Sequence, residues 1–183
     1  MVSEHLPDQH VLEAELGGPM QFHGLIAPAL PATPLRSHLA YRRHVAGKEQ
    51  EVHIYNPSAL VPHGSDASVL QALLMAPPAL TRPDWVVLVR VEDLDDALLK
   101  LDPTHTLTLD GLVEAVTRLQ TTRFTLETPG ASLGRQTFHL IDRLLIHSQS
   151  DRPGGQKFVR LFQVEFNPTT LALEGLNASG VQA

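Results

Sequence analysis

The feature that most constrains this chain is the order in which helical and strand-like hydrophobic patterns follow one another. Three segments carry apolar side chains at the three- and four-residue spacing of amphipathic helices: 67–76, 92–101 and 108–122. A β-branched run at 85–89 separates the first two, and Pro77 and Pro78 end the first, because proline lacks the amide donor that continues a helix. The pattern therefore predicts a helix, a strand and then two further helices.

Antiparallel strands are predicted on both sides of this helical region. Apolar and polar residues alternate in three later segments: 123–127, 136–147 and 158–166. Before the helices, 36–45 and 49–55 are extended in character and flank Gly47, so they predict a β-hairpin. This hairpin either extends the domain's own sheet or pairs with a second copy across a two-fold axis. A last short helix is predicted over 167–173.

Composition agrees with a single folded domain. The chain has 183 residues, 43% of them hydrophobic and 19% charged, which is enough for a packed core. It has no cysteine, which excludes a disulfide scaffold, a thiol nucleophile and cysteine-based metal centres. No apolar run approaches the roughly 20 residues of a membrane span and no signal core follows Met1, so we expect a cytoplasmic protein without membrane contact. We expect a leader at 1–35, a domain at 36–176 and a tail at 177–183.

The order of the predicted elements is typical of a winged helix. The expected fold class is α+β: helix, strand, helix and helix followed by antiparallel strands, with an additional N-terminal β-hairpin. In a winged helix two helices pack at an angle, the second can lie in a DNA groove, and the hairpin touches the DNA backbone. We expect the helix that ends at Thr122 to pack on the aromatic side of the antiparallel ribbon, with the arginines of the ribbon turned outward.

Charge is distributed unevenly along the chain. The net charge is −6, but residues 1–117 hold 7 basic and 15 acidic residues, whereas 118–166 hold 7 basic and 4 acidic ones. A positive segment of this kind can be the electrostatic footprint of a nucleic-acid site. The candidate DNA-contacting residues lie at the end of the third helix and on the strands after it: Thr117, Arg118, Thr121, Arg123, Arg135, Arg143, Arg152, Lys157 and Arg160.

These candidates have different expected roles. Arg118 would contact guanine or phosphate from the helix, with threonines on phosphate oxygens. Arg152 and Lys157 flank a glycine-containing turn, where a wing would approach the DNA backbone. The competing interpretation is an ordinary solvated surface, because Asp110 and Glu114 lie on the same helix and further acids lie among the strands.

Metal and enzyme chemistry are not indicated. Ten histidines occur, but no pair has the spacing of a His-Glu-x-x-His site. The chain lacks a Gly-x-Ser-x-Gly elbow, a Walker phosphate loop and a dinucleotide fingerprint. The acids Asp93, Asp95 and Asp96 lie at a helix start, where the helix dipole accounts for them without a cation. We therefore expect no metal, no cofactor and no enzymatic activity.

The run from Tyr55 to Phe166 resembles the N-terminal winged-helix domain of plasmid replication initiators of the RepA/TrfA kind. The likeness lies in leucine-bearing helices and apolar strands in a common order: 65–74, 91–94 with Leu98 and Leu101, 112–122, 138–142 and 159–162. Helix 112–122 looks like the family's helix that ends in an Arg-Leu pair before a strand.

The resemblance implies a DNA-binding and dimerisation domain that contacts origin repeats, with host replication proteins as further partners. Such initiators usually carry two winged-helix domains, of which the first contributes dimerisation and backbone contacts. The sequence ends soon after one such domain, so we expect either a fragment of a two-domain initiator or a one-domain relative. The alternative function is a winged-helix-like module that acts only in protein–protein assembly, with the acidic half as its partner surface.

Overall fold

The structure is a computed structural model that describes residues 36–45, 47–58, 60–76, 85–130, 134–150 and 153–173. Its strands are β1 (His38–Val45), β2 (Lys48–Tyr55), β3 (Val86–Arg90), β4 (Arg123–Glu127), β5 (Arg135–His139), β6 (Ile141–Ser150) and β7 (Lys157–Phe166). Its helices are α2 (Asp66–Met75), α3 (Val91–Leu101), α4 (Leu109–Thr121) and α5 (Pro168–Leu173). The expected leader, 1–35, and tail, 177–183, lie outside the described residues.

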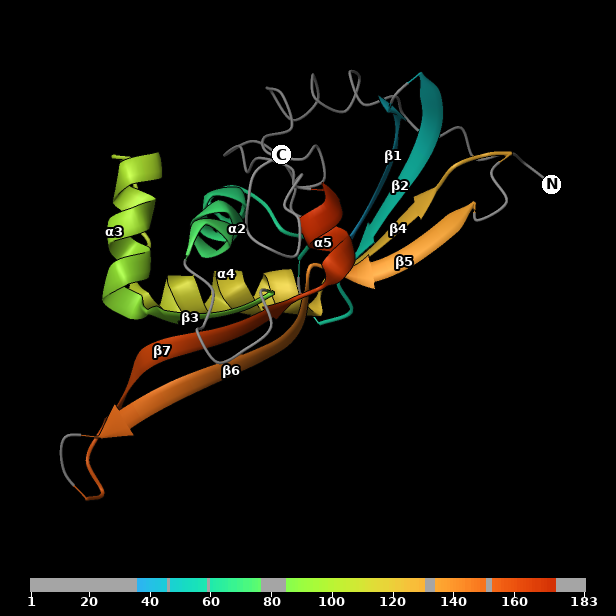
Figure 1. Ribbon diagram of the computed structural model, residues 1–183. Helices are drawn as coiled ribbons and strands as arrows, with labels where there is room; N and C mark the ends of the chain where they lie inside the picture. The colour runs from blue at the N-terminus through green and yellow to red at the C-terminus, as the bar shows by residue number, and fades with distance from the viewer. Residues whose placement is uncertain are drawn as a thin grey trace.

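The strands form two antiparallel sheets, so the fold is α+β. One sheet has four strands in the order β1-β2-β4-β5, and the other has three in the order β3-β7-β6. Helices α2, α3 and α4 lie on one side of the three-stranded sheet (Figure 1). The far end of the β6–β7 hairpin projects beyond the rest of the molecule in the same view. Within the described ranges, no helix has the length and apolar character that a membrane span requires.

The predicted N-terminal hairpin is confirmed and extends the domain's own sheet. Strand β1 pairs with β2, and β2 pairs in turn with β4 from Glu51↔Glu127 to Tyr55↔Arg123. Gly47 has φ 75°, a left-handed conformation that glycine adopts without steric cost, and it makes the turn between β1 and β2. Strand β1 remains the outer strand of the four-stranded sheet.

The single strand expected at 136–147 is wrong, because the chain divides there between the two sheets. Strand β5 pairs with β4, whereas β6 pairs with β7. Leu140 lies between them and is buried, and its carbonyl accepts the amide of Asn167 at 3.1 Å and the hydroxyl of Thr170 at 2.9 Å. A buried carbonyl needs hydrogen-bond donors. At the break between β5 and β6, residues at the start of α5 supply the donors to the carbonyl of Leu140.

The helices bury the apolar faces that the periodicity predicts. The fully buried leucines come from all three helices that cover the sheet: Leu70, Leu73, Leu94, Leu98 and Leu119. They share one core with the four-stranded sheet, where the rings of Phe124 and Phe138 stack with centroids 5.9 Å apart. Ile146 and Phe158 stay exposed, because the outer part of the hairpin extends beyond the helices (Figure 1).

Candidate nucleic-acid interface

Helix α4 turns threonine hydroxyls toward its exposed side. The hydroxyl of Thr108 caps the helix by accepting the amide of Gly111 at 3.2 Å. The hydroxyl of Thr117 is exposed and donates to the carbonyl of Val113 at 2.7 Å, and that of Thr121 donates to the carbonyl of Thr117 at 2.9 Å. The hydroxyl oxygen of Thr121 also accepts the side-chain amide of Asn56 at 3.2 Å. For either threonine, a bond to a phosphate oxygen requires the hydroxyl proton to leave its backbone acceptor.

Arg118 does not point outward from α4 as the sequence analysis expects. Its guanidinium makes two hydrogen bonds of 2.9 Å to the carboxylate of Asp66, the first residue of α2. Asp66 is 1% exposed and also accepts the amide of His63 at 3.0 Å. The hydrogen bonds to Asp66 raise the pKa of Arg118 above its ordinary value, although burial acts in the opposite direction. A buried carboxylate needs a counter-charge, so Arg118 fastens α4 to α2.

Two further candidates lie on the outer face of the four-stranded sheet. Arg123 is exposed on β4, directly opposite Tyr55 of β2 and His139 of β5. Arg135 is exposed on β5, and its Nε lies 3.1 Å from a carboxylate oxygen of Glu127. Arg123 therefore belongs to a row without carboxylates, whereas the charge of Arg135 is balanced by a neighbour.

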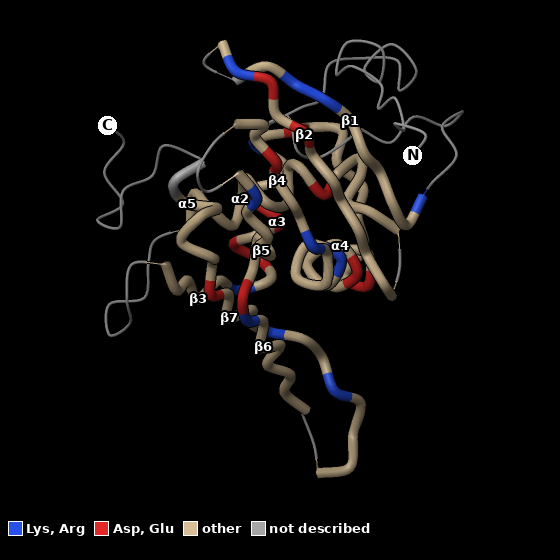
Figure 2. Tube along the Cα trace, turned by 90° about the vertical axis from the view of Figure 1, so that its right-hand side faces the viewer, with Lys and Arg blue, Asp and Glu red and all other residues tan. Residues whose placement is uncertain are grey.

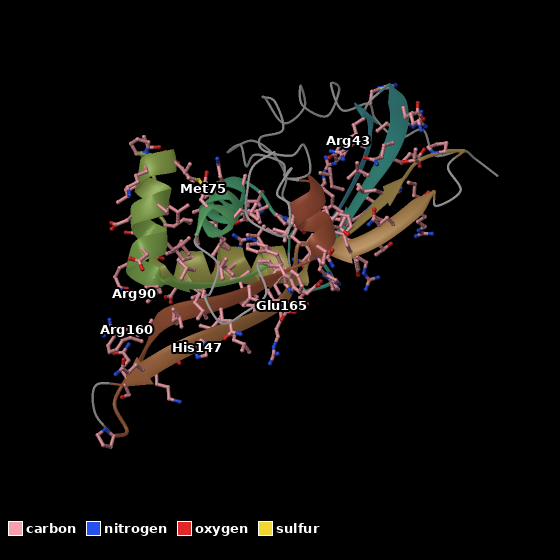
Figure 3. The ribbon with its side chains drawn as sticks, viewed as in Figure 1. Arg43, Met75, Arg90, His147, Arg160 and Glu165 are labelled. Carbon is pink, nitrogen blue, oxygen red and sulfur yellow. The ribbon has the colours of Figure 1, made fainter. Side chains whose placement is uncertain are left out.

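The cations of the β6–β7 hairpin do not share one face. Arg143 is exposed and lies opposite Glu165, so those two side chains share one face. Arg160 instead has its guanidinium 3.6 Å from the carboxylate of Glu92 on α3, on the side of the helices. Figure 3 shows Arg160 close to Arg90, the residue that precedes α3. The expectation that the ribbon's arginines all turn away from the helices is therefore wrong.

The outer part of the hairpin is nonetheless basic. The described residues 144–150 and 153–163 hold the cations Lys157 and Arg160 and no carboxylate. Lys157 is exposed next to the turn, where Gly154 has φ 75°. Figure 2 shows basic segments along this hairpin and beside α4. Arg152, the candidate on the other side of the turn, lies outside the described residues.

Sequence reasoning missed the residues whose role depends on distant partners. Asp66 is not among the candidates from sequence, and no local signal shows that Arg118, 52 positions away, binds it. The structure also brings Glu51 and His53 of β2 beside Glu127 of β4, which the sequence does not indicate. The histidines His139 of β5 and His147 of β6 lie in different sheets, so the structure does not bring them together.

The comparisons with known proteins show a fold and no family. No protein-family model matches the sequence, and no curated protein matches it significantly. The fold is similar to a crystal structure of RctB domains 2–3, with a TM-score of 0.59 and 16% identity over 83% of this chain and 57% of that chain. A selenomethionine derivative of domains 2 and 3 of RctB gives a TM-score of 0.58 and 18% identity over 81% of this chain and 56% of that one. This chain thus spans little more than half of those chains.

Proposed function

We propose that this chain is a winged-helix module of a plasmid-type replication initiator, which binds duplex DNA mainly through phosphates and acts as a homodimer on repeated origin sites. The observation that carries the proposal is the arrangement of α2, β3, α3, α4 and the β6–β7 hairpin around a sheet of order β3-β7-β6. In a winged helix the second helix of the pair enters a groove and the hairpin approaches the backbone. Here those elements are α4 and the β6–β7 hairpin.

A resemblance of the sequence and a similarity of the fold support this proposal. The sequence resembles the N-terminal domain of plasmid initiators, and the fold is similar to domains 2 and 3 of RctB, itself a replication initiator. From the same likeness we propose that the chain acts in the cytoplasm and that host replication proteins are further partners. No catalytic role belongs to the proposal, since positioning DNA and a second copy requires none.

The proposed contacts are the exposed cations of the hairpin and the exposed face of α4. Lys157 next to the turn and Arg143 on β6 would neutralise phosphates, and Thr117 would contact a phosphate oxygen from α4. Arg123, just after α4, extends this surface onto the four-stranded sheet. Arg118 is left out, because its guanidinium is held by Asp66.

Dimerisation is proposed through the outer edge of β1. Among the described strands, β1 (His38–Val45) is the edge of its sheet, and an edge strand can add a further strand. Pairing with the β1 of a second copy around a two-fold axis would join the two sheets into one. Light scattering of the full chain tests this step, and a monomer at micromolar concentration contradicts it.

The DNA contact is tested by fluorescence anisotropy with a labelled random-sequence duplex, because phosphate contacts do not depend on sequence. Replacing Arg143 and Lys157 together by alanine should weaken binding at least about tenfold, since each charge-assisted contact contributes about 1.5–3 kcal/mol. Lys100→Ala is the matched control: it also removes an exposed cation, but from the last turn of α3. Equal losses in the two variants would contradict the proposed surface.

An assembly module without DNA binding is the second candidate, and the acidic start of α3 favours it. Glu92 and Asp93 lie in the first turn of that helix and are exposed, and Glu92 lies 3.6 Å from Arg160 of the hairpin. Acidic side chains there repel phosphate. A stable dimer with no duplex binding at about 50 mM salt would support this candidate over the first.

A further inference from the structure

The outer face of the four-stranded sheet holds a group of metal-ligating side chains that the proposed DNA contacts do not use. Glu51 and His53 alternate on β2, and Glu127 lies on β4 directly opposite Glu51. One ligand atom of each, two carboxylate oxygens and an imidazole nitrogen, lies within 4.8 Å of the other two. The three side chains are neither fully exposed nor buried, so an ion entering from solvent can reach them.

We propose that Glu51, His53 and Glu127 form a binding site for a zinc-class divalent cation, with water as the fourth ligand. One nitrogen and two oxygen donors suit borderline cations such as Zn²⁺, whereas Mg²⁺ and Ca²⁺ favour oxygen ligands alone. Bonds of about 2.0–2.2 Å in a tetrahedral site place ligand atoms about 3.4 Å apart. Separations of up to 4.8 Å therefore require the ligand atoms to approach one another by up to about 1.4 Å, which side-chain rotation provides.

Two arginines, one on each outer strand of the sheet, form ion pairs with the same two carboxylates. The Nε of Arg42 lies 3.5 Å from Oε1 of Glu51, while Oε2 of that carboxylate lies 3.8 Å from Nε2 of His53. Arg135 in turn binds Oε1 of Glu127. Arg135 thus holds one oxygen of Glu127 and leaves the other for a metal, as partners of ligating carboxylates do in metal sites. Arg42 pairs with Glu51 by charge alone, because its Nε makes no hydrogen bond.

The local charge also permits a cation. Counting Glu49, which lies 3.8 Å from Arg42, the cluster has three carboxylates and two guanidinium groups and is net negative. Glu51 and Glu127 lie directly opposite each other on the neighbouring strands β2 and β4. Two carboxylates in this position repel each other unless a positive charge lies between them. A bound cation would remove that repulsion and fasten the N-terminal hairpin, through β2, to β4.

The test uses the full chain, made metal-free with a chelator and then titrated with ZnCl₂ by calorimetry and thermal unfolding. We expect Zn²⁺ to raise the melting temperature by several degrees, because a ligand that binds the folded state stabilises it, and Mg²⁺ to leave it unchanged. His53→Ala and Glu127→Gln should each weaken Zn²⁺ binding by more than about tenfold.

His147→Ala is the matched control, because His147 is exposed on β6, which belongs to the other sheet. It should bind Zn²⁺ as the unmodified chain does, which separates this site from the other histidines of the sequence. Metal-free Glu127→Gln should unfold close to the unmodified chain, which shows that the variant folds. Zn²⁺ affinity within about twofold of the unmodified chain in His53→Ala, or no Zn²⁺ effect on the unmodified chain, would overturn the assignment.

Discussion

At the scale of single residues, the Asp66–Arg118 pair fixes the orientation of α4 relative to α2. Asp66 opens α2 and Arg118 lies in the last turn of α4, so their two hydrogen bonds tie together helices that are otherwise joined by apolar packing. The carboxylate is almost fully buried, whereas the guanidinium keeps partial access to solvent. An arginine that the sequence analysis assigns to DNA therefore serves to orient the helix instead.

Removing this carboxylate should be costly. Asp66→Ala leaves a half-buried guanidinium without its partner and should lower the free energy of unfolding by about 3–5 kcal/mol, measured by urea denaturation. Glu114→Ala, which removes an exposed carboxylate 3.9 Å from Arg118, should cost less than about 1 kcal/mol. The paired change Asp66→Leu with Arg118→Met should recover part of the loss. Equal effects of Asp66→Ala and Glu114→Ala would contradict the role of the pair.

A pH effect is expected at Asp102, after the end of α3. The hydroxyl of Thr104 donates to its carboxylate at 2.6 Å and the amide of Thr104 at 2.9 Å, and these hydrogen bonds lower the pKa of Asp102. A lowered pKa in the folded state gives stabilisation that is present above the unfolded value, about 3.9, and is lost as pH falls through the folded value. Thr104→Ala should move the pKa of Asp102 back toward its ordinary range, as followed by NMR titration. An unchanged pKa would contradict this assignment.

At the scale of elements, local patterns predict helices well and sheets less well. The helix expected at 108–122 is observed as α4 (Leu109–Thr121), because its cap and its periodicity are both local signals. The division of 136–147 into β5 and β6 depends instead on contacts with Asn167 and Thr170, which no local pattern indicates. The partners of Glu51 and Asp66 were missed for the same reason, since strand register and helix packing are non-local.

The join between the two sheets gives a prediction at this scale. Thr170→Val keeps the shape of the side chain but removes the hydroxyl that donates to the buried carbonyl of Leu140. We expect a loss of about 1–2 kcal/mol in the free energy of unfolding, because the carbonyl keeps one of its two partners, the amide of Asn167. Thr117→Val removes an exposed hydroxyl and is the control. A smaller loss for Thr170→Val than for Thr117→Val would show that the join does not depend on this bond.

At the scale of the whole molecule, a net charge of −6 coexists with a basic hairpin. The described outer part of the hairpin is free of carboxylates and its far end projects beyond the rest of the molecule (Figure 1), although Arg160 within it pairs with Glu92 at the acidic start of α3. Steering of a polyanion depends on the field at the surface that it meets and less on the total charge. The basic end of the hairpin at Lys157 is consistent with phosphate contact by a protein whose net charge is negative.

The most direct test of phosphate contact is the salt dependence of duplex binding, measured for the full chain and for Lys157→Ala. The logarithm of the dissociation constant is plotted against the logarithm of the salt concentration. Each neutralised phosphate contributes about 0.9 to the slope, so a binding mode based on phosphates predicts a steep loss of affinity with salt. The Lys157→Ala variant should have a slope shallower by about 1. No binding at low salt, or the same slope for both proteins, would contradict the account.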